Sequence, residues 1–379
     1  MNMIYLDNSA TTKPCRSAVD NINKALCDNW GNPSSLYGFG VNAEQAVSLT
    51  KERLADMLSC REDEIIFTSG GTESNNLALL GGAEAMKRRG KRIVTTSVEH
   101  PSVLNTCDRL ADLGFEIVKI SPENDGSINR RKFLSAVNDD TILVSMMLVN
   151  NETGCVFPVK EIADELRSSG SKALIHCDAV QAFGKLPIDI SELKVDLLSA
   201  SGHKIHASKG IGFLYKSKKI NLRPVLFGGG QESGLRSGTE AVPAIAGLYG
   251  AVGELDISGN LEKMKLLHRY AVERLTELGL VTFNSPMTDG LPYILNISVP
   301  GYRSETLLHF LEQKEIYVSS GSACSKGKGS YVLNEMGLPR NIIDSALRLS
   351  FSRYNDFSDI DALCNGLKSA AATLRKSRI

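Results

Sequence analysis

The sequence of 379 residues lacks several features that mark common protein classes. It has no surplus of charge, since 43 Lys and Arg balance 43 Asp and Glu, and no block of like charge, so we predict no direct nucleic-acid partner. No apolar run approaches about 18 residues, which predicts no membrane span. The start, MNMIYLDNSATTKP, lacks a basic segment followed by a long apolar run, so we expect a cytoplasmic rather than a secreted protein.

The sequence also lacks closely spaced cysteines. Its eight cysteines form no CxxC pair of the kind that zinc sites and redox motifs use, which weighs against a metal-binding protein. Disulfides are the weaker expectation in a cytoplasmic chain, so most of the cysteines are predicted to be small core residues. The exception is Cys324, in the stretch SSGSACSKGKGS, whose small and basic residues are typical of an exposed loop.

Short β-branched runs do alternate with amphipathic segments between about residues 41 and 255. Helical periodicity is clear in stretches such as 158–168. Strands are predicted at EIIFT, RIVTT, FEIVKI, TILVSMMLV, ALIHC, VDLLSAS and IGFLY. This alternation predicts an α/β fold with a mostly parallel seven-stranded sheet flanked by helices.

The pattern changes at DISGN, residues 256–260. A long amphipathic helix is predicted from about Leu261 to Leu278, followed by a mixed region with strands such as YILNISV and a final helix. We therefore expect a large domain over residues 15–255 and a smaller α+β domain built from residues 1–14 and 256–379.

Polar residues follow several of the predicted strands, and ligands of parallel α/β sheets bind beyond the carboxyl ends of the strands. After EIIFT, the stretch SGGTESNN places Gly71 and Thr72 at the start of a helix, which suits a phosphate, although no Walker A lysine follows. The other residues directly after strands are His100, Asn151, Asp178, Gln181 and Lys204. All of them are expected at one edge of the sheet.

Each of these residues taken alone has a structural explanation. Thr72 can be a helix cap, His100 a capping or core histidine, Asp178 the start of a turn and Lys204 a solvated strand end. Together, a phosphate cradle, a lysine at one strand end and a carboxylate at a neighbouring strand end indicate a site for pyridoxal 5'-phosphate. In such a site the lysine forms a Schiff base and the carboxylate pairs with the pyridine nitrogen.

Ten motifs, in this order along nearly the whole chain, resemble those of the cysteine desulfurases in the class V aminotransferase group. They are YLDNSATT, GNPSS, SGGTESNN, EHPSV, VNNETG, DAVQ, SGHKIHASKGIG, RSGT, SSGSACS and ALRLSFSR. The resemblance implies the fold of pyridoxal phosphate enzymes of type I and a homodimer.

The resemblance also implies roles for single residues. Lys204 is the Schiff-base lysine, His100 stacks on the cofactor ring and helps to move protons, and Asp178 holds the pyridine nitrogen. Asn151 and Gln181 orient the cofactor. The implied phosphate contacts are Gly71, Thr72, Ser201, His203 and, reaching across from a partner subunit, Thr239. Arg348 and Asn32 are the implied substrate contacts, whereas Arg353 is the less favoured carboxylate ligand and Arg236 is expected to be structural.

The implied reaction converts L-cysteine to alanine and leaves the sulfur as a persulfide on Cys324. Lys326 and Lys328 flank this thiol and favour its thiolate form. A loop of small residues can carry the sulfur outward to an acceptor protein, either an iron-sulfur scaffold or a tRNA-thiolation protein.

The sequence departs from the family pattern at three places. His206-Ala207-Ser208 stands where an aromatic residue followed by Gly-Pro is expected, Ser9 replaces a common alanine, and the loop after Cys324 is slightly short. His206 and His203 could suggest a metal pair, but no third ligand is evident and we interpret His206 as a loop variation. The alternative functions are a selenocysteine lyase, a transaminase with the same cofactor, or a catalytically idle sulfur-transfer scaffold.

Overall fold

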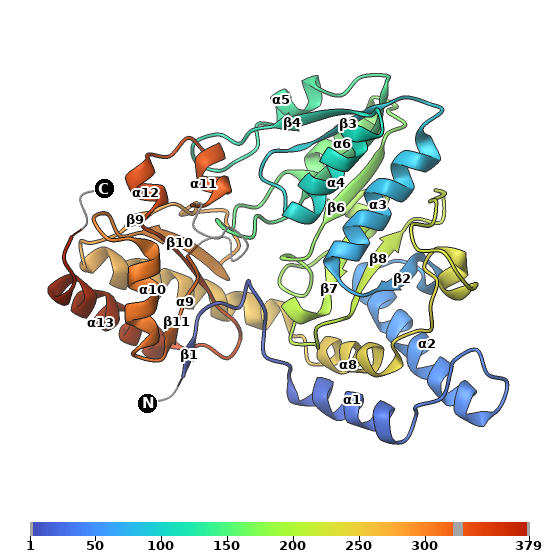
Figure 1. Cartoon of the computed structure of the whole chain (residues 1–379), viewed down its shortest axis with the longest axis horizontal. Helices are drawn as coiled ribbons and strands as arrows, with labels where there is room; N and C mark the ends of the chain where they lie inside the picture. Colours follow the sequence, from blue (N-terminus) through green and yellow to red (C-terminus); the bar gives the residue numbers. More distant parts are fainter. Residues whose placement is uncertain (1–2, 321–328, 377–379) are drawn as a thin grey trace.

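The computed structural model describes residues 3–320 and 329–376. Its elements form two groups that lie side by side, a larger one around a seven-stranded sheet and a smaller one around a three-stranded sheet (Figure 1). No helix within these residues is long and apolar enough to cross a membrane.

The larger sheet has the strand order β2-β8-β7-β6-β5-β3-β4 in the described chain. Only β8 runs against its neighbours among these seven strands, while the remaining pairs are parallel. The strands are β2 (Ile65–Thr68), β3 (Arg92–Thr96), β4 (Glu116–Ile120), β5 (Thr141–Met147), β6 (Leu174–Asp178), β7 (Leu197–Ser201) and β8 (Gly212–Lys216). Each corresponds to one predicted run, so the mostly parallel α/β fold is confirmed.

Helices cover this sheet because its central strands are apolar on both faces. Every residue of β5 and β6 is buried, as expected for parallel strands between two helical layers. The helix α3 packs against the central strands, and α1 and α2 pack on α8. The helices are α1 (Arg16–Cys27), α2 (Gly38–Leu58), α3 (Gly71–Met86), α4 (Pro101–Asp112), α5 (Arg130–Ser135), α6 (Val159–Ser168), α7 (Ile190–Leu193) and α8 (Val242–Gly253), with 3-10 turns η1 (Glu62–Glu64), η2 (Gly202–Lys204) and η3 (Gln231–Gly234).

The smaller group contains the antiparallel sheet β12-β10-β9 and the parallel pair β1-β11. The pair joins the start of the chain to its last third. The strands are β1 (Ile4–Tyr5), β9 (Thr282–Phe283), β10 (Ile294–Ser298), β11 (Ile316–Tyr317) and β12 (Ala346–Ser350). The helices are α9 (Ile257–Glu277), α10 (Ser304–Glu312), α11 (Tyr331–Glu335), α12 (Arg340–Ile343) and α13 (Phe357–Thr373).

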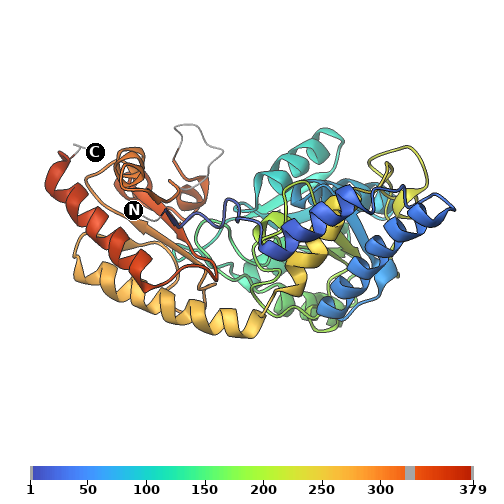
Figure 2. The same ribbon diagram turned by 90° about the horizontal axis from the view of Figure 1, so that it is seen from below.

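The long helix α9 leads from the larger group along the smaller one (Figure 2). It begins one turn before the predicted start, because Asp256 accepts a hydrogen bond from the backbone N–H of Gly259 at 3.0 Å and caps the helix. The stretch DISGN, at which the sequence pattern changes, is therefore the start of this helix. The expected domain boundaries near residues 15 and 255 stay a prediction.

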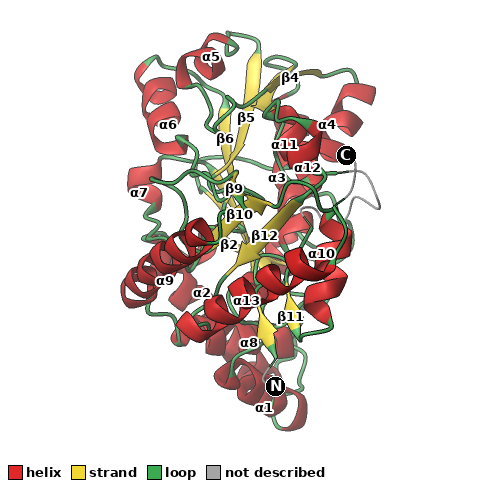
Figure 3. Ribbon diagram, turned by 90° about the vertical axis from the view of Figure 1, so that its left-hand side faces the viewer, coloured by secondary structure: helices red, strands yellow, loops and turns green. Residues whose placement is uncertain are grey.

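The two groups meet at the carboxyl ends of the parallel strands. Seen from the side of the smaller group, α10 and α13 lie in front and the strands of the larger sheet lie behind (Figure 3). Residues from both groups line the cavity described next.

Candidate active site

A cavity of about 290 Å³ contains most of the predicted site residues. Its walls come from the carboxyl ends of β5, β6 and β7, the first turns of α3 and α4, and β12. The predicted residues among its lining are Gly71, Thr72, His100, Asn151, Asp178, Gln181, Ser201, His203, Lys204 and Arg348. Residues far apart in the sequence therefore share one site.

Three predicted residues do not lie in this cavity as the described residues form it. Asn32 is exposed in the segment before α2, and Thr239 is exposed after η3. Cys324 falls within residues 321–328, outside the described residues. The roles predicted for these three residues stay predictions.

The first turn of α3 forms one end of the cavity. A Cβ at Gly71 would lie 2.6 Å from Cγ2 of Val180, so the close approach of the helix start to the turn after β6 needs a glycine there. Glu73 in the same turn accepts a hydrogen bond from the backbone N–H of Ser69 at 2.8 Å and one from Nε of Arg236 at 2.8 Å. The free N–H groups of this helix start suit an anion.

Lys204 lies in η2, the turn that directly follows β7, and contacts the start of the chain. Its Nζ donates to the backbone oxygen of Ala10 at 2.8 Å and to that of Ser9. The Ser9 oxygen also accepts from Nε2 of Gln181 at 3.0 Å, and Oε1 of Gln181 accepts from Nζ of Lys185 at 3.0 Å. Burial, and then the positive charges of Lys204 and Arg348, lower the pKa of Lys185 to about 7.

Asp178 is buried at the end of β6, and two N–H donors hold its carboxylate. Oδ1 accepts from the backbone N–H of Val180 at 2.9 Å, and Oδ2 accepts from Nδ2 of Asn75 at 2.7 Å. Opposite it, His100 caps α4, because its Nδ1 accepts from the backbone N–H of Ser102 at 3.2 Å. Burial lowers the pKa of His100, Lys204 lowers it further and Asp178 opposes the shift. His100 is therefore neutral near neutral pH.

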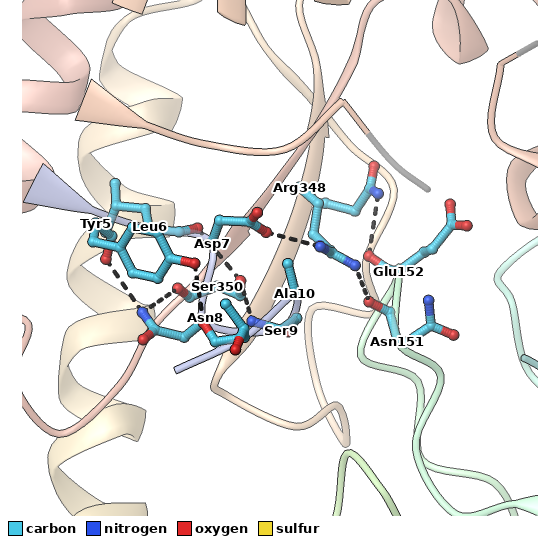
Figure 4. A network of polar contacts seen from close by, with 12 residues as sticks. Tyr5, Leu6, Asp7, Asn8, Ser9, Ala10, Asn151, Glu152, Arg348 and Ser350 are labelled. Carbon is cyan, nitrogen blue, oxygen red and sulfur yellow. Dashed lines mark hydrogen bonds and ion pairs between the residues drawn. The ribbon is translucent and has the colours of Figure 1, made fainter. Parts of the chain in front are cut away.

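Arg348 of β12 faces the cavity from the smaller group (Figure 4). Its guanidinium donates to Oδ1 of Asp7 at 2.8 Å and to the backbone oxygen of Asn151 at 2.9 Å. Nε of Arg348 and Oδ1 of Asn151 are buried and make no hydrogen bond within the described residues. Arg353, the less favoured candidate, pairs with Glu254 and does not line the cavity.

Neither the described cysteines nor His206 forms part of a metal site in the described ranges. No group of three His, Cys, Asp or Glu there is arranged to hold a metal ion. Five of the described cysteines are buried, and burial raises the pKa of one of them, Cys107, to about 12. It raises the pKa of the partly buried Cys60 to about 12 as well. His206 turns away from His203 and the cavity: its Nδ1 lies 2.9 Å from the backbone oxygen of Lys13, and its ring packs on Tyr354.

Several residues around the cavity were not predicted from the sequence. They are Asp7, Asn75, Ser102, Lys185 and Tyr331, which line the cavity or bond to residues that do. A search at strand ends identifies the first residue after a strand. It misses these residues, because most of them lie within helices or in a segment from the other group of elements. One local signal was available for Ser102. In EHPS, His100 stands two residues before it at the start of a helix, where an N-cap side chain accepts a hydrogen bond from a backbone N–H.

Comparisons with known proteins agree with this geometry. The aminotransferase class-V family matches residues 4–363. The chain is 40% identical over 378 residues to cysteine desulfurase IscS of Methanosarcina thermophila, covering 98% of this chain and 93% of that protein. It is 41% identical over 361 residues to putative cysteine desulfurase IscS 1 of Bacillus subtilis (strain 168), covering 94% and 95%. The solved structure of a NifS-like protein superposes with a TM-score of 0.93 at 34% identity, covering 98% of this chain and 100% of that one.

Proposed function

The chain belongs to the aminotransferase class-V family and to its cysteine desulfurase group, and from this premise we propose that it uses pyridoxal 5'-phosphate to take sulfur from L-cysteine. The products are L-alanine and a persulfide on Cys324, from which an acceptor protein takes the sulfur. The observation that carries the proposal is the single cavity that holds Lys204, His100, Asp178 and Arg348 beside the start of α3.

The residues in the cavity fit pyridoxal 5'-phosphate. The start of α3, where a Cβ at Gly71 would fill the space, suits the phosphate, with Thr72, Ser201 and His203 around it. Asp178, which accepts hydrogen bonds as a carboxylate, would pair with the protonated ring nitrogen of the cofactor. Gln181 and Asn151, which also line the cavity, would contact the other polar groups of the ring. When bound, this group supplies an electron sink that lets the C–S bond of cysteine break.

The side chains around it bind the substrate and move its protons. Arg348 binds the carboxylate of cysteine with a planar fork of N–H donors, held in place by Asp7 and Asn151. Asn32 is the second substrate contact inferred by resemblance. Lys204, whose amine lies at the cavity, takes the proton from the substrate Cα and returns protons to the product.

Cys324 receives the sulfur. Its thiolate attacks the sulfur of cysteine, an S–S bond forms, the C–S bond breaks with its electron pair left on the carbon side, and a proton then completes alanine. The residues that flank segment 321–328 support this assignment: Ser319 pairs with the backbone of Arg348, and Ser330 bonds to the buried Glu152. The described residues on either side of the segment, Ser319 and Ser330, therefore lie close to the cavity.

The protein acts as a cytoplasmic homodimer in this proposal. Thr239 is exposed and lies outside its own cavity, which is the position expected of a residue that completes the phosphate cradle of a partner subunit. Large apolar side chains are exposed around the start of α2 and near η3, as at an interface. They are Trp30, Leu36, Tyr37, Phe39 and Phe227. The sulfur acceptor is an iron-sulfur scaffold or a tRNA-thiolation protein.

The test is to incubate the cofactor-loaded protein with L-cysteine and a reducing thiol and to measure alanine and sulfide. We expect both products in equal amounts, and none from Lys204→Ala, which also loses the visible absorption of the bound cofactor. Alanine from selenocysteine but not from cysteine would instead indicate a lyase, amino-group transfer to a keto acid would indicate a transaminase, and no alanine at all would indicate an idle scaffold.

A further inference from the structure

A line of hydrogen bonds connects Asp178 to His100 through two buried residues that have no assigned role. Nδ2 of Asn75 donates to Oδ2 of Asp178 at 2.7 Å and to Oγ of Ser102 at 2.9 Å. Oγ of Ser102 lies 2.8 Å from Nδ1 of His100. Asn75 is 1% exposed and Ser102 is 8% exposed, so water does not replace these bonds readily.

The direction of each bond follows from its neighbours. The Asp178 carboxylate only accepts, so it fixes the amide nitrogen of Asn75 toward itself. The second N–H of that amide points to Ser102, whose oxygen accepts it. The hydroxyl hydrogen of Ser102 is then free to point to Nδ1 of His100. Turning the amide over would place Oδ1 of Asn75 against the carboxylate, which explains why Oδ1 stays buried with no hydrogen bond within the described residues.

His100 consequently has one favoured tautomer. Nδ1 receives the Ser102 hydroxyl and also the Ser102 backbone N–H at 3.2 Å, so it carries a lone pair. The hydrogen of the neutral ring is then on Nε2. Protonation of the ring would put a hydrogen on Nδ1, facing the backbone N–H, and the network therefore opposes it.

The charges around the ring do not reverse this preference. Asp178 of β6 favours a charged ring, whereas Lys204 of η2 disfavours it, and His203 of the same turn has a pKa lowered to about 4, mainly by burial. Burial, the largest influence on His100, also lowers its pKa. Nε2 forms no hydrogen bond in the part of the chain that the structure describes, and His100 lines the cavity.

We propose that Asn75 and Ser102 are positioning residues that hold His100 in the Nε2–H tautomer, so that His100 offers a ligand in the cavity a hydrogen-bond donor instead of a base. This inference rests on the proposed function and refines it, because it leaves the removal of the substrate proton to Lys204. The first two turns of α3 would therefore contribute to both groups: the helix start forms the phosphate cradle, and Asn75, one turn later, orients His100 through Ser102.

The direct test reads the tautomer by ¹⁵N NMR of histidine-labelled, cofactor-loaded protein, with His100→Gln to assign the signal. The wild type is expected to show Nε2–H and no protonation of His100 near neutral pH. Asn75→Asp keeps the shape but provides only acceptors toward Ser102. The serine hydroxyl should then turn to position 75, its oxygen should accept a hydrogen from Nδ1, and the pKa of His100 should rise.

Ser102→Ala and Ser102→Thr provide a second test if Asn75→Asp does not fold. The alanine variant loses the hydroxyl donor to Nδ1 and keeps only the longer backbone N–H contact at 3.2 Å, so we expect a weaker preference for the Nε2–H tautomer. We also expect a loss of roughly tenfold in kcat/KM, a fraction of the 10²- to 10⁴-fold that a positioned acid or base usually contributes. The threonine variant should restore both. Asn76→Asp is the control, because it adds the same charge at the next residue, whose side chain bonds to the Thr72 backbone and not to Ser102.

A wild-type ring with its hydrogen on Nδ1 would overturn the proposal, and so would an unchanged tautomer and pKa in both Asn75→Asp and Ser102→Ala. These results are independent of turnover. If the wild type formed no alanine from cysteine, the proposed function would fail while the tautomer measurement would still decide the role of Asn75 and Ser102.

Discussion

At the scale of single residues, polar side chains in the cavity already have hydrogen-bond partners within the chain before any ligand binds. Arg348 has a side chain only 4% exposed, and its charge is balanced by Asp7 rather than by water. A buried charge without a partner is costly, so Asp7 compensates the guanidinium charge and orients the side chain before any substrate arrives. A preoriented fork loses little freedom when it binds a carboxylate.

Arg348→Lys tests this fork. The lysine keeps the positive charge for Asp7 but has no planar pair of donors, so the substrate carboxylate should lose one charge-assisted hydrogen bond. Such a bond contributes about 1.5–3 kcal/mol, which corresponds to a rise in KM for cysteine of about 10- to 100-fold. Steady-state kinetics with cysteine measure it. Arg353→Lys is the matched control and should keep the wild-type KM. If both variants kept the wild-type KM, neither arginine would be the ligand of the substrate carboxylate.

At the scale of elements, buried side chains tie the strand ends together beneath the cavity. Oε1 of Glu99, after β3, accepts from Oγ1 of Thr96 at 2.7 Å and from the backbone N–H of Met147 at 3.0 Å, at the end of β5. Burial raises the pKa of Glu99 to about 8. The two strand ends are thus joined by a carboxyl group that is mostly protonated at neutral pH.

Glu99→Gln should change how stability depends on pH. The folded pKa of about 8 lies above the unfolded value of 4.5, so the proton stabilises the fold fully below about pH 4.5 and this contribution is lost as the pH rises to 8. The glutamine cannot titrate. The unfolding free energy of the wild type should therefore fall relative to the variant by about 1.4 kcal/mol per pH unit between pH 5 and 8.

Urea unfolding of both proteins at pH 5.5, 6.5 and 7.5 measures this difference. The exposed Glu273 of α9 offers a control, Glu273→Gln, which should follow the wild type at every pH. Parallel stability profiles for the wild type and Glu99→Gln would show that Glu99 is ionised throughout this range.

At the scale of the whole molecule, the sequence predicted the parts better than their arrangement. Each of the seven strands of the large sheet was predicted from a short apolar run between helical segments. Such runs are typical of parallel strands that are buried on both faces and rich in β-branched residues. The reversed direction of β8 and the pairing of β1 with β11 depend on contacts between distant segments, which local periodicity does not report.

The same limit applies to the site. His100, Asp178 and Lys204 were found because parallel strands end at one edge of a sheet. Asp7 was not, since its link to Arg348 spans 341 positions and joins the first residues to β12. Asn75 has no local signal either, because its role depends on the distances to Asp178 and Ser102 and not on its neighbours in the sequence.

Thr239→Val tests whether two chains share each cofactor site. If the hydroxyl of Thr239 completes the phosphate cradle of a partner subunit, cofactor binding and dimer formation are linked, and each must strengthen the other by mass action. The valine variant keeps the shape but loses the hydroxyl, so it should bind pyridoxal 5'-phosphate more weakly. Adding the cofactor should then strengthen its dimer less than the wild-type dimer, as measured by sedimentation with and without cofactor.

Thr282→Val, at an exposed position of β9, is the control and should behave as the wild type. If cofactor binding and dimer formation are linked, each must favour the other. Removing the cofactor from the wild type must therefore weaken the dimer, and dilution of the protein must release the cofactor. A cofactor-loaded monomer of normal absorbance would contradict the shared site, because a cradle that lacks the partner's hydroxyl should hold the phosphate less tightly. In that case the strand and helix ends of one chain that form the cavity would be sufficient for the cofactor, and the exposed Thr239 would need another explanation.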